Sequence, residues 1–233
     1  MKQADGSDGF RLKRGVFFAR VDGEGILLDL RSNRYIALDQ SATAIWQYLA
    51  GDTPLEASAG DVARQVELWK RAGLVVPAAQ PDAVPLPRAK ELGTSASLHL
   101  DPGAARVSTT GALQLLRAQW WRRRSLERRG LCQTLYHLQR EARAPREAVS
   151  DEAVARVVRT LRAMRLPFRL GSEDCLARSI DLARALSQQG IESDVCFGVV
   201  RFPFLAHAWV EREGRVLSEP TSRVPRFTLL ARF

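Results

Sequence analysis

The sequence contains few cysteines and few histidines for a chain of 233 residues. The odd number of cysteines, with no C-x-x-C pair, suits a reducing compartment better than a framework of disulfides. None of the spacings matches a zinc finger or a zincin motif, so we expect no metal and no other cofactor. The six residues are Cys132, Cys175, Cys196, His99, His137 and His207.

Long apolar runs are also missing. No run approaches the roughly 18 residues that a membrane span requires. The opening MKQADGSDGF carries acids and glycines where a secretory signal would need a basic start and an apolar stretch. We therefore expect a soluble, cytoplasmic protein without stable membrane anchoring. With 45% hydrophobic residues, the chain can form one large core or two smaller ones.

Basic residues outnumber acidic ones and give a net charge of +9, which attracts anionic partners at long range. The densest basic run extends from Arg117 to Arg129 and is typical of a helix with Leu113, Leu116 and Trp120 on one stripe. This pattern allows two interpretations: a solvated helix face, or a contact with phosphate or lipid.

The order of predicted elements indicates an α+β protein of two domains. Strands at 16–21, 25–30 and 34–38 precede helices that begin near Asp39 and Asp61. Four prolines in PAAQPDAVPLPRAK then interrupt helix and sheet alike. This segment predicts a boundary between a domain at 1–79 and a domain at 80–233, in which helices at 111–127, 131–143 and 151–164 precede a further helix and three strands.

Cys175 is the first candidate for chemistry. Ser172 can cap a helix that runs to about Gln189, which places Cys175 in the first turn. Unpaired backbone N–H groups and the positive end of the helix dipole favour a thiolate there. Glu173 and Asp174 oppose this effect, so a separate base is needed.

His207 can supply that base, because it lies in the alternating strand pattern His-Ala-Trp-Val-Glu. If the following loop is the three residues 212–214, Glu211 faces Arg215 and His207 faces Glu219. A two-residue loop would instead put Glu219 on the opposite face. In the first arrangement Cys175 is the nucleophile, His207 the general base, and Glu219 the group that orients the imidazole.

The segments Asp174-Cys175-Leu176, His207-Ala-Trp-Val and Ser218-Glu219-Pro220 resemble the transglutaminase-like leader peptidases of lasso peptide biosynthesis, often called the B protein. The resemblance implies a papain-like cysteine peptidase domain and a triad of Cys175, His207 and Glu219. The family usually has Asp at the third position, so Glu219 departs from the pattern. The resemblance also implies two partners, a lasso precursor peptide and an asparagine-synthetase-like cyclase.

The first 75 residues resemble the winged-helix recognition domain that is similar to the pyrroloquinoline quinone chaperone. The pattern of three strands followed by helices carries this likeness, in GVFFARVDGEGILLDLRSNRYIALDQSATAIWQYL. Such domains bind a leader peptide as an added strand beside the third strand and against the last helix. By position, the resemblance implies leader contacts at Arg34, Tyr35, Ile36, Val66, Trp69 and Lys70.

Two other functions stay open from the residues alone. A winged-helix front end and a basic helix are compatible with nucleic-acid binding, although we expect no nucleic-acid partner because this leaves the Cys, His and Glu arrangement unexplained. Helix 61–72 also has two acids, which is unfavourable for reading a groove. In the second alternative, an amine resolves the thioester at Cys175 and the product is a cross-link.

Overall fold

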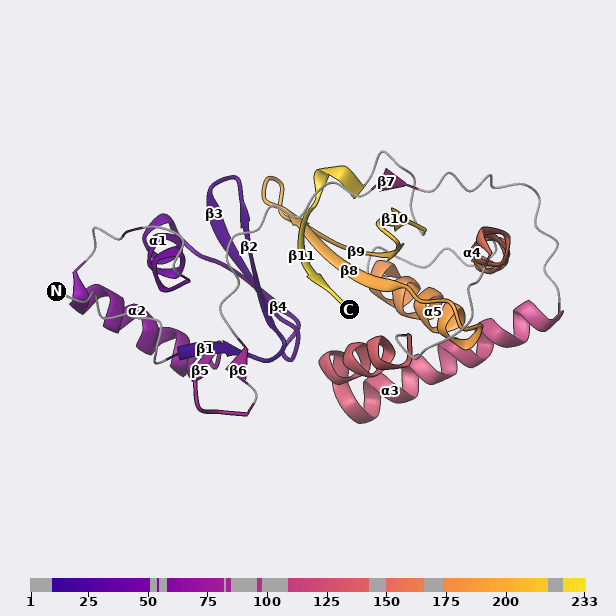
Figure 1. The fold of residues 1–233 in the computed structure, drawn as a ribbon, viewed down its shortest axis with the longest axis horizontal. Helices are drawn as coiled ribbons and strands as arrows, with labels where there is room; N and C mark the ends of the chain where they lie inside the picture. The colour runs from indigo at the N-terminus through magenta and orange to yellow at the C-terminus, as the bar shows by residue number, and fades with distance from the viewer. Residues whose placement is uncertain are drawn as a thin grey trace. The chain divides into compact units, whose positions relative to one another are not determined.

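A computed structural model describes residues 10–50, 54, 58–81, 83–84, 96–97, 109–142, 150–165, 174–217 and 224–233. The chain divides into two compact units, Met1–Leu92 and Gly93–Phe233. Each unit has its own sheets and helices, which Figure 1 shows in the colours of the chain order. The described helices include none that is long and apolar enough to cross a membrane.

An antiparallel sheet of three strands forms the first part of unit one. The strands β2 (Val16–Val21), β3 (Glu24–Asp29) and β4 (Arg34–Ala37) pair in chain order, as the sequence predicts. Asp22 and Gly23 form the first turn with φ of 50° and 87°. Positive φ at both central residues is typical of a two-residue hairpin turn, whose twist matches the twist of the flanking strands.

A second small sheet in the same unit has the order β5-β1-β6. It consists of β1 (Phe10–Lys13), β5 (Val75–Pro77) and β6 (Ala83–Val84), with β1 in the centre. None of these three strands is predicted from the sequence, since each is short and lacks clear alternation. β6 lies beyond residue 79, the predicted boundary, and still pairs with β1 in unit one.

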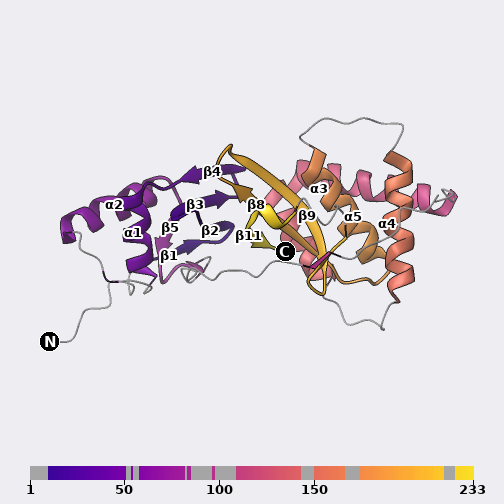
Figure 2. The same cartoon turned by 90° about the horizontal axis from the view of Figure 1, so that it is seen from above.

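Two helices cover the sheets of unit one. Asp39 caps α1 (Gln40–Leu49), because its carboxylate accepts the backbone N–H of Ala42 at 2.7 Å. Ser58, rather than the predicted Asp61, caps α2 (Ala59–Arg71). Figure 2 shows both helices on the side of unit one that carries β5 and β1.

The core of unit one is centred on Trp46, which is 1% exposed. Its ring stacks on Phe18 with 4.9 Å between centroids and meets Trp69 edge-on at 5.2 Å. These aromatic pairs join a strand and both helices in one packed cluster.

Unit two begins with a layer of helices. The long α3 (Thr109–Ala142) bends at Gly130, whose φ of 72° and ψ of 174° are not helical. The sequence predicts this break, since it separates the helical patterns at 111–127 and 131–143. α4 (Asp151–Arg165) and α5 (Asp174–Gln188) follow, and α5 packs between α3 and the strand β9. Figure 1 shows α3 running beside α5.

Polar contacts fix α5 against α3. The Nε of Arg122 donates to the carboxylate of Asp181 at 2.8 Å, and the Asp181 side chain is 5% exposed. Arg184 pairs with Glu141 and also lies over the ring of Trp121 at 4.6 Å. These contacts hold the helix that carries Cys175 in a fixed position.

A five-stranded sheet completes unit two, in the order β11-β8-β9-β10-β7. β8 and β9 form its centre and pair antiparallel along their full length. The sequence predicts β8, β9 and β10 but not β7 or β11. The bounds are β7 (Ala96–Ser97), β8 (Asp194–Val200), β9 (Leu205–Arg212), β10 (Arg215–Val216), the 3₁₀ turn η1 (Val224–Arg226) and β11 (Thr228–Arg232).

Candidate active site

Cys175 lies in the first turn of α5 and is half-buried. A hydrogen bond with the His207 side chain is the largest influence on this thiol, and it lowers the pKa of Cys175. Burial acts in the opposite direction, while backbone hydrogen bonds with Ala208 and Leu176 and the charge of His207 lower the pKa further. The net effect favours the thiolate, which is the reactive form of cysteine.

His207 is the third residue of β9 and is 7% exposed. The structure therefore brings together the two side chains that the sequence places in the roles of nucleophile and base. Their elements meet because α5 packs directly on β9. A histidine in contact with a half-buried thiolate is the arrangement of an acyl-transfer enzyme.

Two aromatic rings surround the imidazole of His207. Trp209 stacks on it with 6.2 Å between centroids and 20° between planes. Phe227 lies at 5.2 Å, tilted by 30°, and approaches from the segment between η1 and β11. Gly198 pairs with His207 across the strands, and its missing side chain leaves space for Trp209 and Phe227. Because the imidazole packs against the rings of Trp209 and Phe227, it can adopt few orientations.

An ion pair with a buried carboxylate holds Trp209 in turn. Its indole Nε1 donates to one carboxylate oxygen of Glu211 at 2.7 Å, and Arg232 donates to the other oxygen at 2.6 Å. Glu211 is 1% exposed, so both of its oxygens need partners. A chain of contacts thus runs from Arg232 on β11 through Glu211 and Trp209 to His207.

The predicted hairpin register between β9 and β10 is wrong. Arg215 pairs with Arg212, and Val216 pairs with Glu211, so the loop has two residues instead of three. Glu213 and Gly214 have φ of 50° and 74°, and two positive φ values define the tight hairpin turn. Glu213 thus adopts the left-handed backbone region, as Gly214 does.

This register removes the strand-pairing argument for Glu219 opposite His207. Glu219 lies outside the described residues, as does Ser172, the predicted cap of α5. The support for Glu219 as the orienting acid is therefore the family resemblance of Ser218-Glu219-Pro220. Among the described carboxylates, Glu211 lies on the same strand as His207, but it is engaged by Trp209 and Arg232.

The other two cysteines are buried. Cys196 on β8 is 0% exposed, and burial raises its pKa far above the ordinary value for a thiol. Cys132 is 7% exposed within α3. In the described part of the chain, no group of three or more His, Cys, Asp and Glu residues is placed to hold a metal ion.

The six residues assigned to leader binding lie on two elements, β4 and α2. Arg34, Tyr35 and Ile36 lie on β4, which pairs only with β3 among the described strands and so forms an edge of its sheet. Val66 and Trp69 are each 4% exposed and belong to the core of unit one. Lys70 is partly exposed, and its Nζ lies 4.3 Å from the centroid of the Phe10 ring.

Sequence reasoning missed the residues that position His207. The alternation in His-Ala-Trp-Val-Glu does place His207, Trp209 and Glu211 on one strand face, and this signal could have suggested a polar network. Phe227 and Arg232 have no comparable signal, because β11 is not recognisable as a strand in RFTLLARF.

Two family matches agree with this geometry. Residues 111–232 match the transglutaminase-like superfamily, and this match covers more than half of the chain. The chain therefore belongs to the transglutaminase-like superfamily. Residues 24–74, which lie within unit one, match coenzyme PQQ synthesis protein D. No curated protein and no solved structure gave a significant match.

Proposed function

We propose that this protein is a leader peptidase of lasso peptide maturation, which binds the leader of a precursor peptide and cleaves it from the core. The contact between the Cys175 thiol and the His207 side chain carries the proposal. It occurs in a transglutaminase-like domain that follows a recognition domain similar to coenzyme PQQ synthesis protein D. That combination supports a peptide substrate held by one domain and cut by the other.

In the proposed reaction, the Cys175 thiolate attacks the carbonyl carbon at the junction of leader and core. The protonated His207 imidazole gives its proton to the departing amine of the core, and the leader remains as a thioester on Cys175. His207 then removes a proton from water, which attacks the thioester and releases the leader carboxylate. We assign Glu219 the role of orienting the imidazole, by resemblance to the family.

The recognition step uses the edge strand β4 in this proposal. Arg34, Tyr35 and Ile36 lie on this strand, and an extended leader can pair with its backbone. Arg34 is exposed, and Ile36 packs partly against the core. Val66 and Trp69 are buried in the core of unit one, and in this proposal they contribute to leader binding through the packing of that core. Binding at unit one raises the local concentration of the scissile bond over Cys175.

The hairpin between β8 and β9 offers a second peptide contact, beside the catalytic pair. Phe202 and Phe204 at its tip are 73% and 51% exposed, and Leu205 is 39% exposed. Leu205 lies two residues before His207 on the same face of β9, which corresponds to roughly 6.6 Å along the strand. Exposed apolar side chains at this distance from His207 can bind apolar residues next to the scissile bond.

The test is cleavage of a lasso precursor peptide by the full chain, followed by mass spectrometry. Cys175→Ala and His207→Ala should each abolish turnover, while leader affinity by fluorescence anisotropy stays near the wild-type value. Glu219→Gln should cost roughly tens to thousands fold in rate, by analogy with orienting acids in triads. Wild-type turnover in Glu219→Gln would contradict only the role of Glu219 as the acid that orients the imidazole of His207.

The same assay separates hydrolysis from transfer to an amine. In water enriched in ¹⁸O, hydrolysis incorporates the label into the new leader carboxylate, whereas transfer to an amine gives an unlabelled amide. A cross-linked product in place of a free leader would contradict the peptidase assignment and leave the roles of Cys175 and His207 intact.

A further inference from the structure

The first half of α3 presents apolar side chains on two opposite sides. Leu115 and Ala118 are 5% and 0% exposed and face the core of unit two. Leu113, Leu116 and Trp120 are 48%, 58% and 64% exposed. At 100° per residue these three residues share one stripe, on the side of the helix opposite to Leu115 and Ala118. We call them the outer stripe.

This outer stripe is unusual for a solvated helix. A tryptophan that is 64% exposed leaves a large apolar surface in water, and two neighbouring leucines extend that surface along two turns. Leu113, Leu116 and Trp120 lie on the side of α3 that does not pack against the core of unit two. Their exposure therefore indicates a surface that is covered by something else.

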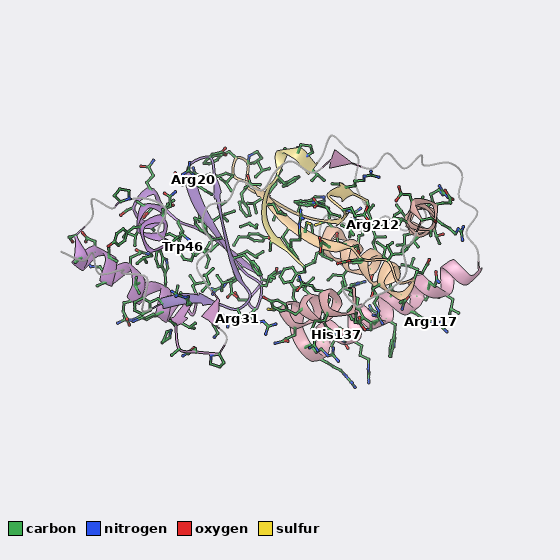
Figure 3. All side chains as sticks on the ribbon, in the orientation of Figure 1. Arg20, Arg31, Trp46, Arg117, His137 and Arg212 are labelled. Carbon is green, nitrogen blue, oxygen red and sulfur yellow. The ribbon has the colours of Figure 1, made fainter. Side chains whose placement is uncertain are left out.

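Four exposed arginines border the outer stripe, namely Arg117, Arg123, Arg124 and Arg128, whereas Arg129 falls on the same side as Leu115 and Ala118. The exposed charged residues of this half of α3 are Arg117, Arg123, Arg124, Arg128, Arg129 and a single acid, Glu127. The guanidinium of Arg124 lies 5.6 Å from the centroid of the Trp120 ring. Figure 3 shows Arg117 on the side of α3 that points away from the sheet. Arg122 is the exception, because it is paired with Asp181.

We propose that the outer stripe of α3 binds the surface of an anionic phospholipid membrane. Helices that lie in the membrane interface combine leucine and tryptophan on one stripe with flanking arginine or lysine. Here the apolar side chains would enter the boundary between headgroups and acyl chains, while the arginines contact lipid phosphates. From Leu113 to Arg129 the helix extends over about 24 Å, parallel to the bilayer plane.

A lipid surface accounts for both the exposed apolar side chains of the outer stripe and the arginines beside them. A nucleic acid would use the arginines but would gain little from Leu113 and Leu116. A membrane uses the leucines, the tryptophan and the four exposed arginines beside them together. The association is peripheral and reversible, and it does not require a membrane-spanning helix. It is also independent of the chemistry at Cys175.

The experiment is co-sedimentation of the full chain with vesicles. One set contains phosphatidylcholine alone, and the other contains about one third phosphatidylglycerol, each at low and high salt. The first variant, Leu113→Ser/Leu116→Ser/Trp120→Ser, removes the outer stripe. Its matched control is Leu68→Ser, which changes a leucine on α2 that is 53% exposed.

A second pair of variants tests the charge. Arg117→Gln/Arg124→Gln removes two arginines beside the stripe, and Arg20→Gln/Arg64→Gln removes two exposed arginines in unit one. Each arginine near an anionic surface contributes roughly fivefold to affinity, so the α3 double variant should bind at least tenfold more weakly. Circular dichroism checks that all variants remain folded.

We expect binding to the anionic vesicles that weakens in high salt, falls at least tenfold in both α3 variants and is unchanged in both controls. Equal binding to neutral vesicles, no binding to anionic vesicles, or equal loss in the control variants would each overturn the proposal. A DNA duplex is tested in parallel. Binding to the duplex without binding to vesicles would assign the arginines to nucleic acid and also overturn it.

Discussion

Gly198→Ala should disturb the catalytic site although the residue carries no functional group. A Cβ at this position would lie 2.7 Å and 2.8 Å from two ring carbons of Trp209 and 3.0 Å from the Cβ of Phe227. Normal carbon contacts are longer, so the neighbours must move by several tenths of an ångström. Trp209 and Phe227 are the two rings that pack on His207.

The size of the effect of Gly198→Ala depends on how far Trp209 and the strands beside β8 can move. The hydrogen bond to Glu211 holds the indole of Trp209, and Gly198 itself lies on β8 between β11 and β9. Overpacking of this kind costs about 1–3 kcal/mol in the free energy of unfolding. A displaced imidazole also loses its geometry toward Cys175, and we expect at least a tenfold decrease in the rate of alkylation at this thiol.

The assay combines thermal unfolding with alkylation of Cys175 by iodoacetamide, located by peptide mapping. Gly60→Ala is the matched control. Its added Cβ would meet only the Ser58 hydroxyl at 3.7 Å, and alanine stabilises a helix relative to glycine. If Gly198→Ala unfolds at the wild-type temperature and Cys175 reacts at the wild-type rate, the packed aromatic environment of His207 is refuted.

Three further predictions test separate parts of the molecule. Because the contact with His207 lowers the pKa of Cys175, alkylation of this thiol should persist below the ordinary thiol pKa of 9.0 and decline as the pH falls through the lowered pKa. His207→Ala should shift this pH profile to higher pH, and an unchanged profile would contradict the contact. Trp46→Ala should destabilise unit one by about 3–5 kcal/mol in chemical denaturation, and a loss below 1 kcal/mol would contradict the packing of Trp46. Arg34→Glu should weaken leader binding in fluorescence anisotropy, whereas Arg20→Glu on the opposite edge strand should not, and equal affinities would exclude the β4 edge.

The sequence predicts the helices of both units and the strands that carry strong local signals. Strand β2 ends and strand β4 begins where predicted, because Asp22-Gly23 and Ser32-Asn33 are strong turn formers. The helix carrying Cys175 ends near Gly190, which has a φ of 77°. Local signals of this kind depend on a few neighbouring residues, so a single sequence contains them.

The errors concern short strands, pairing between distant segments and one hairpin turn. β1, β5 and β6 are too short to show alternation. β11 pairs with β8, and β9 and β10 lie between these two strands in the sequence, so no local pattern indicates the pairing. The β9–β10 hairpin was misjudged because a glutamate rarely adopts the positive φ found at Glu213. That single residue decides whether the loop has two or three members.

The candidate site shows the same division. Cys175 and His207 can be selected from sequence because a helix start and an alternating strand each give a local pattern. The contacts of Phe227 and Arg232 depend on the position of β11, and no local rule supplies that position. The outer stripe on α3 was visible as a pattern, but only its exposure separates it from a core face.

The most direct test of the central claim is intact mass spectrometry of the enzyme, quenched shortly after mixing with the precursor peptide. The account predicts a covalent adduct whose added mass equals the leader minus one water, which peptide mapping locates at Cys175. His207→Ala should accumulate no such adduct. Cleavage of the precursor by Cys175→Ala at the wild-type rate would contradict the account.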